Sequence, residues 1–216
     1  MECVFRTRRS GLRVGPLARD QRDLINLIIK EICEGVTPLA VRPPIMVWGK
    51  ECRQNRDVGF FSDTSRGYSF SGQIAEANPL SPSLKALLDF VNDVFSASFN
   101  GILINRYEGG ETSIGRHSDD ESGLSRHAGV VAISVGATRT FRVKSKGRVR
   151  VTYIHDDDEE SKTIEPHKIV YDHRTGDGEI LQMEGDFQKE FTHEVPKAKR
   201  DGPGTRYSFT FREHVK

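Results

Sequence analysis

The sequence predicts one domain of the α+β class, mainly β, in which two helices pack against an antiparallel barrel or sandwich. Three observations support this prediction. The chain has 216 residues, which is enough for one substantial core. Helical apolar patterns occur within the first hundred residues, whereas apolar and polar residues alternate in the second half. With 36% hydrophobic and 29% charged residues, the composition excludes collagen-like, coiled-coil and wholly disordered proteins.

Two amphipathic helices are predicted ahead of the β-rich part. The first begins at Asp20 and ends before Gly35 and Pro38, and the second covers 83–95 with Pro82 at its start. In both, apolar residues recur at the spacing of a helix face that packs on a core. They are Leu24, Ile25, Leu27, Ile28 and Ile32 in the first helix, and Leu84, Leu87, Leu88, Val91 and Phe95 in the second.

Six short strands follow, because the apolar period changes from helical to alternating and Gly or polar turns separate the segments. The predicted strands are 102–107, 130–135, 139–143, 148–154, 179–183 and 206–211.

Two further segments differ in composition. Residues 1–19 hold five arginines, one acid and no helical apolar stripe, which predicts a flexible basic arm; a nuclear-import or organelle-targeting segment is the alternative. Residues 155–178 are too acidic and too long for a tight turn, which predicts a surface insertion between strands.

The chain is expected to be an intracellular, soluble protein. No apolar stretch approaches the roughly 20 residues that span a bilayer, so no membrane association is predicted. Cys3, Cys33 and Cys52 lack C-x-x-C spacing, which favours reduced thiols over a disulfide framework or a zinc module.

A metal site is the chemistry that the sequence indicates first. His117 and Asp119 are two residues apart, so on an extended segment both side chains leave the same face. This pair alone is as compatible with a solvated turn. His193, just before the final strand, provides a third ligand, and two imidazoles with one carboxylate form the set that non-haem Fe(II) oxygenases use.

The final strand provides a second indication, because its polar and aromatic residues alternate. If the aromatic face packs against the helices, Arg206 and Arg212 point into the barrel, where each guanidinium needs an anion. A small dicarboxylate that chelates the iron at one end would satisfy them. Two arginines on a solvated strand face remain the alternative.

The order of these residues resembles the AlkB family of Fe(II)/2-oxoglutarate dioxygenases, which remove alkyl groups from nucleic-acid bases. The resemblance extends from about Val47 to Arg212 and is greatest to the eukaryotic branch that repairs duplex DNA. The matching text is Asn105-x-Tyr107, His117-x-Asp119, His193 and Arg206-x-Ser208-x-x-x-Arg212, with Ile104-Asn105-Arg106-Tyr107, His117-Ser118-Asp119-Asp120-Glu121 and Val135-Gly136-Ala137-Thr138-Arg139.

The resemblance implies a double-stranded β-helix, or jelly roll, with its catalytic core at 101–216 and with helices and a nucleotide-recognition lid at 20–100. It implies Fe(II) as cofactor, 2-oxoglutarate and O2 as cosubstrates, and His117, Asp119 and His193 as metal ligands. Ser208 stands where many members have Asn. The implied 2-oxoglutarate site contains Asn105, Tyr107, Arg206, Ser208, Thr210 and Arg212, with Arg206 at the carboxylate farther from the metal.

Two segments before the core are candidates for substrate binding. In 67–72, Tyr68 and Phe70 alternate around Ser69 and are suited to stacking on an extracted base; core aromatics of an ordinary strand are the alternative. Trp48-Gly49-Lys50 stands where the resembling branch has a finger that fills the space left by the base. Burial of Trp48 in the core is the competing explanation.

Charged residues complete the substrate hypothesis. Arg56 is expected beside the finger, and Asp120 or Glu121 at the pocket mouth would favour a cationic methylated base, although solvent-facing acids are as compatible with the sequence. Residues 139–150 carry six cations and no acid, which predicts a hairpin whose basic face contacts phosphates. A contribution to solubility alone is the alternative. The phosphate candidates are Arg142, Lys144, Arg148 and Arg150.

The expected function is oxidative demethylation of bases such as N1-methyladenine and N3-methylcytosine in DNA, hence DNA repair. The expected partner is duplex DNA bound with base flipping by a monomer, and the expected location is the nucleus. Two alternatives stay open. One is a same-fold oxygenase that acts on RNA, a protein side chain or a small metabolite, and the other is a nucleic-acid-binding module without turnover.

Overall fold

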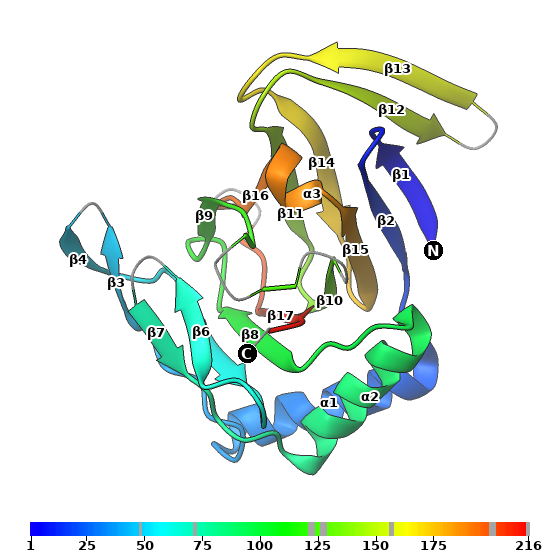
Figure 1. The fold of residues 1–216 in the computed structure, drawn as a ribbon. Helices are drawn as coiled ribbons and strands as arrows, with labels where there is room; N and C mark the ends of the chain where they lie inside the picture. The colour runs from blue at the N-terminus through cyan, green and yellow to red at the C-terminus, as the bar shows by residue number, and fades with distance from the viewer. Residues whose placement is uncertain are drawn as a thin grey trace.

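Two β-sheets face each other and two helices cover the outer face of the larger sheet (Figure 1). This computed structural model describes residues 1–47, 49–70, 73–120, 124–125, 129–155, 158–198 and 202–214, without the side chains of 68–70 and 73–75. The mainly β class predicted from the sequence is confirmed. No helix in the described ranges is both long and apolar enough to cross a bilayer.

The larger sheet is antiparallel and takes strands from both ends of the chain. Its order is β13 (Asp158–Ile164), β12 (Val149–His155), β1 (Glu2–Arg6), β2 (Ser10–Pro16), β15 (Glu179–Gly185), β10 (Val130–Gly136), β17 (Arg206–Arg212), β8 (Gly101–Tyr107) and β5 (Asp57–Phe61). The smaller sheet has the order β14 (Ile169–Thr175), β11 (Arg139–Ser145), β16 (Phe191–Val195) and β9 (Ile114–His117). All six predicted strands are present.

Two hairpins stand beside the open end of this arrangement. They are β3 (Pro44–Val47) with β4 (Lys50–Arg53), and β6 (Gly67–Phe70) with β7 (Gln73–Glu76). Figure 1 shows both on the same side of the molecule as β9. The nucleotide-recognition lid expected within 20–100 stays a prediction.

Both predicted helices are confirmed, as α1 (Arg19–Cys33) and α2 (Pro82–Phe95). Their apolar faces share one core with Tyr207, Phe209 and Phe211 of β17. The residues between these aromatics therefore face the space between the sheets, as the alternation predicts. The Ser81 hydroxyl caps α2 by accepting a hydrogen bond from the backbone N–H of Leu84.

The N-terminal segment is not a flexible arm, which corrects the expectation for 1–19. Strand β2 pairs with β15, and β1 pairs with β2 and β12, so the segment lies inside the larger sheet. Phe5, Leu12 and Val14 join the core between the sheets. Three of its arginines pair with acids, as in Arg6–Glu159 and Arg13–Glu184.

Strand pairing also changes the expectations for residues 155–178 and 139–150. The acidic 155–178 stretch, expected as a surface insertion between strands, forms strands itself: it contains the largely exposed β13, which pairs with β12, and β14, which pairs with β11. The basic run at 139–150 is not a hairpin, because β11 belongs to the smaller sheet and β12 to the larger one. Strand β13 forms a hairpin with the preceding β12, whereas β11 and β14 pair although β12 and β13 lie between them in the sequence.

Candidate metal and cosubstrate site

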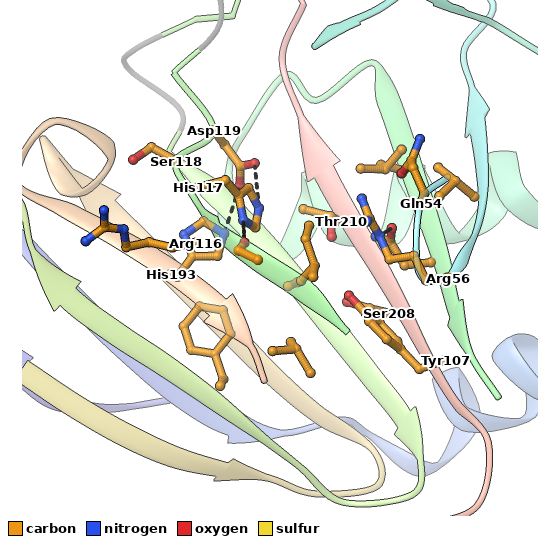
Figure 2. A pocket seen from close by; sticks show the side chains of 18 of the residues that line it. Gln54, Arg56, Tyr107, Arg116, His117, Ser118, Asp119, His193, Ser208 and Thr210 are labelled. Atoms are coloured by element: carbon orange, nitrogen blue, oxygen red, sulfur yellow. Dashed lines mark hydrogen bonds and ion pairs between the residues drawn. The ribbon is translucent and has the colours of Figure 1, made fainter. Parts of the chain in front are cut away.

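A cavity of about 500 Å³ lies between the sheets at their open end. It contains all three predicted metal ligands together with the polar face of β17. Figure 2 shows Tyr107, Ser208 and Thr210 around the same space as His117, Asp119 and His193. The predicted site residues that line it are Asn105, Tyr107, His117, Asp119, His193, Arg206, Ser208, Thr210, Arg212 and Arg56.

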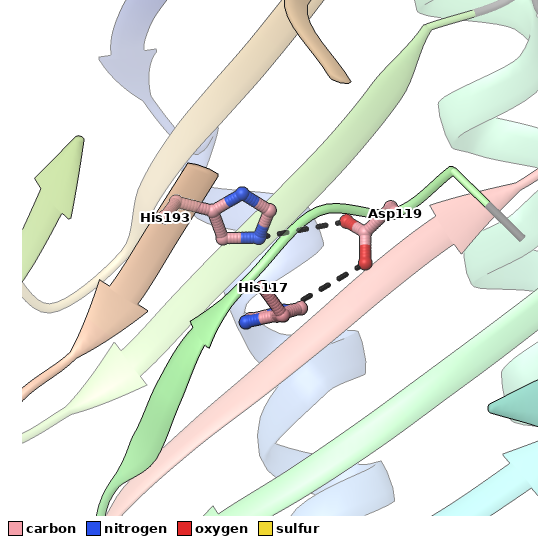
Figure 3. A group of neighbouring side chains, drawn as sticks. All are labelled: His117, Asp119 and His193. Carbon is pink, nitrogen blue, oxygen red and sulfur yellow. Dashed lines mark ion pairs between the residues drawn. The ribbon is translucent and has the colours of Figure 1, made fainter. Parts of the chain in front are cut away.

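The metal candidates converge because β9 and β16 are paired. In this register His193 lies directly opposite His117, and their ring centroids are 4.3 Å apart. Asp119 follows two residues after the end of β9, with its carboxylate 3.8 Å from His117 Nε2 and 3.6 Å from His193 Nε2 (Figure 3). One ligand atom from each residue lies within 4.8 Å of the others, as binding of one ion requires.

Neighbouring groups orient both imidazoles. His117 Nδ1 donates a hydrogen bond to the carbonyl oxygen of Gly115 at 2.9 Å, which leaves the Nε2 lone pair for a metal. The ring of Phe141 stacks on His193 at a centroid distance of 5.2 Å and an angle of 28°. Both rings therefore have defined orientations.

The charge states suit a divalent metal. Burial lowers the pKa of His193 to about 3 and also lowers that of His117, so both imidazoles are neutral near pH 7. Burial alone would raise the pKa of Asp119, but Arg212, His193 and His117 outweigh it and hold this pKa at about 2. Asp119 Oδ2 is buried without a hydrogen-bond partner among the described residues. A cation would satisfy this oxygen, so the donor set fits Fe(II).

Arg206 forms the opposite end of the cavity and is buried. Its Nη2 donates to Ser134 Oγ at 2.6 Å, and its guanidinium lies 5.2 Å from the centroid of the Tyr107 ring. Its Nε and Nη1 have no hydrogen-bond partner within the described part of the chain, and burial lowers its pKa. Two buried donors on one guanidinium match a carboxylate in geometry and charge.

The other cosubstrate candidates divide into two groups. Asn105, Ser208 and Thr210 lie on paired strands, and Asn105 Oδ1 accepts a hydrogen bond from Arg56 Nε at 2.6 Å. Arg212, which was expected in the 2-oxoglutarate site, also has an anionic partner within the chain. Its Nη2 lies 2.5 Å from Asp119 Oδ1. In this structure Arg212 therefore balances the charge of the metal-ligand candidate.

The structure describes only some of the predicted substrate contacts. Gly49, with φ of +73°, lies in the turn of the β3–β4 hairpin, and Lys50 begins β4 opposite Val47, which lines the cavity. Arg56 lies in the cavity rather than only beside that turn. Trp48 and Glu121 lie outside the described residues, as do the side chains of Tyr68, Ser69 and Phe70.

Asp120 does not line the main cavity, in contrast to its expected place at the mouth. It borders a second cavity of about 210 Å³, and its carboxylate pairs with Lys146 at 2.8 Å. Its carboxylate is therefore already paired with a cation in this structure.

Most of the predicted phosphate contacts are already neutralised. Arg142 forms two hydrogen bonds to Asp172 at 2.7 Å, Lys144 pairs with Glu194 at 3.0 Å, and Arg148 pairs with Glu165 at 3.3 Å. Arg150 is exposed on β12, in the other sheet. The run therefore forms no continuous basic face, because acids distant in sequence lie beside it.

Sequence reasoning missed the role of Arg139, which it counted among the surface cations. Arg139 is 1% exposed and donates hydrogen bonds to the carbonyl oxygens of Gly109, Thr112 and Pro196 at 2.6–3.0 Å. It thereby joins the loop after β8 to the end of β16. A signal in the sequence was its place at the start of an alternating strand, three residues after Gly136.

Comparisons with known proteins agree with this geometry. The sequence model of the 2OG-Fe(II) oxygenase superfamily matches residues 21–212. DNA oxidative demethylase ALKBH2 of Bos taurus is 30% identical over 172 residues, covering 78% of this chain and 56% of that protein. Alpha-ketoglutarate-dependent dioxygenase alkB homolog 3 of Homo sapiens is 33% identical over 146 residues, covering 67% of this chain and 47% of that protein. This chain thus spans about half the length of these two relatives.

A solved structure gives the same result at the level of fold. The structure of OsALKBH1 matches with a TM-score of 0.51 and 18% sequence identity, covering 94% of this chain and 97% of that one. At this identity the match supports a shared fold and no finer property.

Metal binding should depend only weakly on mild acidification. Two imidazoles with the ordinary pKa of about 6.5 would together weaken binding roughly 100-fold between pH 7.5 and 5.5, because protons compete for Nε2. Since the pKa values of His117 and His193 are lowered, we expect less than about a tenfold loss over this range. Anaerobic Co(II) titrations at both pH values measure this, and a full 100-fold loss would contradict it.

Proposed function

The chain belongs to the 2OG-Fe(II) oxygenase superfamily as an AlkB-type dioxygenase, and from this premise we propose that it oxidatively demethylates alkylated bases in DNA. One observation carries the proposal. A single cavity holds a two-histidine, one-carboxylate ligand set at one end and a buried guanidinium with unsatisfied donors at the other. The relatives named DNA oxidative demethylase support DNA as the substrate.

The ligand set would bind the metal, and Arg206 would bind the cosubstrate. His117, Asp119 and His193 would hold Fe(II), which with 2-oxoglutarate and O2 supplies the oxidation of an N-methyl C–H bond to C–OH. Arg206 would bind the carboxylate of 2-oxoglutarate that is farther from the metal, while Ser134 and Tyr107 keep the guanidinium in place. The hydroxymethyl group on the base nitrogen then leaves as formaldehyde.

The cavity is large enough for a base beside the cosubstrate. Its volume of about 500 Å³ lies within the usual range of small-molecule sites. Ile45 and Val47 of the β3–β4 hairpin and Ile114 of β9 provide apolar wall, on which a planar ring can pack. A base in a duplex must leave the stack to reach this depth, so base flipping belongs to the proposal.

Cations at the cavity mouth are better phosphate candidates than the 139–150 run. Arg116 on β9 and Lys50 on β4 are exposed, and neither pairs with an acid in the described part of the chain. Arg116 lines the cavity, and Lys50 pairs with Val47, which also lines it. A strand that delivers its base to the cavity would bring its phosphates to this rim.

The nuclear location expected from the N-terminal arginines stays a prediction. The monomeric state also stays a prediction.

A product assay tests the function directly. We expect the full chain with Fe(II), ascorbate and 2-oxoglutarate to release formaldehyde and succinate from duplex oligonucleotides that contain N1-methyladenine or N3-methylcytosine. His193→Ala should abolish turnover because it removes one metal ligand, whereas His173→Ala, outside the cavity, is the matched control. Turnover only on RNA or on a non-nucleic substrate would contradict DNA repair, and DNA binding without turnover would contradict an enzyme.

Removing the buried guanidinium should separate cosubstrate binding from stability. In Arg206→Met we expect the KM for 2-oxoglutarate to rise 10- to 100-fold, because a charge-assisted hydrogen bond contributes about 1.5–3 kcal/mol. The Tm of the cosubstrate-free protein should not fall, because the variant also removes buried, unsatisfied donors. Arg148→Met, an exposed substitution outside the cavity lining, controls for loss of charge. An unchanged KM would contradict the assignment.

The phosphate candidates predict different salt dependences. Each phosphate contact adds about 0.9 to the slope of log K against log salt, so Arg116→Gln and Lys50→Gln should each lower the slope by about that amount. Arg142→Gln changes the net charge equally but removes a cation already paired with Asp172, so its slope should stay unchanged. Equal changes in all three variants would contradict a local binding rim.

A further inference from the structure

Asp119 is held by a residue outside the ligand set. Its backbone N–H donates a hydrogen bond to Gln188 Oε1 at 2.9 Å. Gln188 lies in α3 (Phe187–Glu190), the short helix that leads directly into β16 and His193. Lys146 Nζ donates to the carbonyl oxygen of Gln188 at 2.7 Å and pairs with Asp120. The helix thus contacts both ligand-bearing segments.

This contact matters because Asp119 lies beyond the strand ladder. The pairing of β9 with β16 ends at His117, so backbone pairing fixes that histidine but not Asp119. Two side-chain hydrogen bonds continue the attachment. Ser118 Oγ donates to the carbonyl oxygen of Phe191 at 2.9 Å, and Gln188 accepts from Asp119.

The N-terminal turn between β1 and β2 holds the same helix. Glu190 Oε2 accepts hydrogen bonds from the hydroxyls of Thr7, at 2.6 Å, and Ser10. Arg9 Nη2 donates to Glu190 Oε1 at 3.1 Å, and the backbone N–H of Asp186 donates to the carbonyl oxygen of Arg9 at 3.0 Å. The turn precedes residue 21, where the family match begins.

We propose that Gln188 is a positioning residue that orients Asp119 for the metal, and that the turn 7–10 holds α3 in the place from which Gln188 acts. The N-terminal segment is then a brace for the metal site. Partners that orient metal ligands affect metal affinity about 10- to 100-fold in other proteins. The inference rests on the metal site of the proposed function but not on its nucleic-acid substrate.

The first test measures Co(II) binding and the Co(II) d–d spectrum of the full chain, anaerobically and without substrate. We expect Gln188→Met to weaken binding about tenfold and to change the spectrum, because Asp119 loses its acceptor. Gln188→Glu keeps an acceptor oxygen at the same reach and should restore the wild-type spectrum. Lys189→Met is the matched control on the same helix, because its ammonium pairs only with Asp186 among the described residues.

The second test is a double-mutant cycle between the turn and the helix. Thr7→Val with Ser10→Ala removes both hydroxyl donors to Glu190 and should weaken Co(II) binding several-fold. Added to Gln188→Met, it should cause little further loss, because the turn acts through Gln188. Additive losses of Co(II) affinity would overturn the proposal that the turn 7–10 acts through Gln188. Near-ultraviolet circular dichroism at the temperature of the titration shows which variants are folded, and Arg9→Met gives a milder break of the same contact.

The outcomes separate the inference from the proposed function. Failure of the wild-type chain to bind Co(II) would overturn the metal site and the inference with it. Equal affinity and identical spectra for wild type and Gln188→Met would overturn only the positioning role. A metal-binding chain that does not act on DNA would overturn the proposed function and leave Gln188 in its role.

Discussion

Strand β17 is buried on both faces, and this constraint decides the character of the molecule. Tyr207, Phe209 and Phe211 are buried against α1 and α2 on one face, where their apolar surface contributes to the largest core. The other face is equally hidden from water but carries two guanidinium groups and two hydroxyls. Buried cations are stable only beside anions or strong acceptors, so this face requires an ionic site between the sheets.

Groups of the chain itself provide only part of the anions and acceptors that these buried cations need. Asp119 balances Arg212, and carbonyl oxygens surround Arg139. Arg206 keeps two donors without an acceptor within the described residues, and it shares the Tyr107 ring with Arg139, whose guanidinium lies 5.7 Å from the same centroid. An anionic cosubstrate would complete this electrostatic arrangement, so stability and binding draw on the same groups.

The sequence was informative where a signal is local. The alternation in 206–212 predicted the two faces of β17, and the spacing of His117 and Asp119 predicted two ligands on one side of a segment. Pairing between distant segments could not be predicted in this way. The arginines of 1–16 concealed the alternation of Phe5, Leu12 and Val14, and the acids that neutralise Arg142 and Lys144 come from other strands. Gln188 carried no local signal, because its role depends on the placement of α3 next to Asp119.

The two outer strands of the larger sheet end it in different ways. At β5, backbone hydrogen bonds with Ala40 and Asn78 occupy peptide groups of Val58 and Phe60 on its outer edge. At β13 the strand presents Asp158, Glu159, Glu160 and Lys162, all solvent-exposed, beside an open backbone edge. Charges on an edge strand oppose its pairing with another copy. The charged composition of β13 therefore disfavours the growth of extended sheets from this edge.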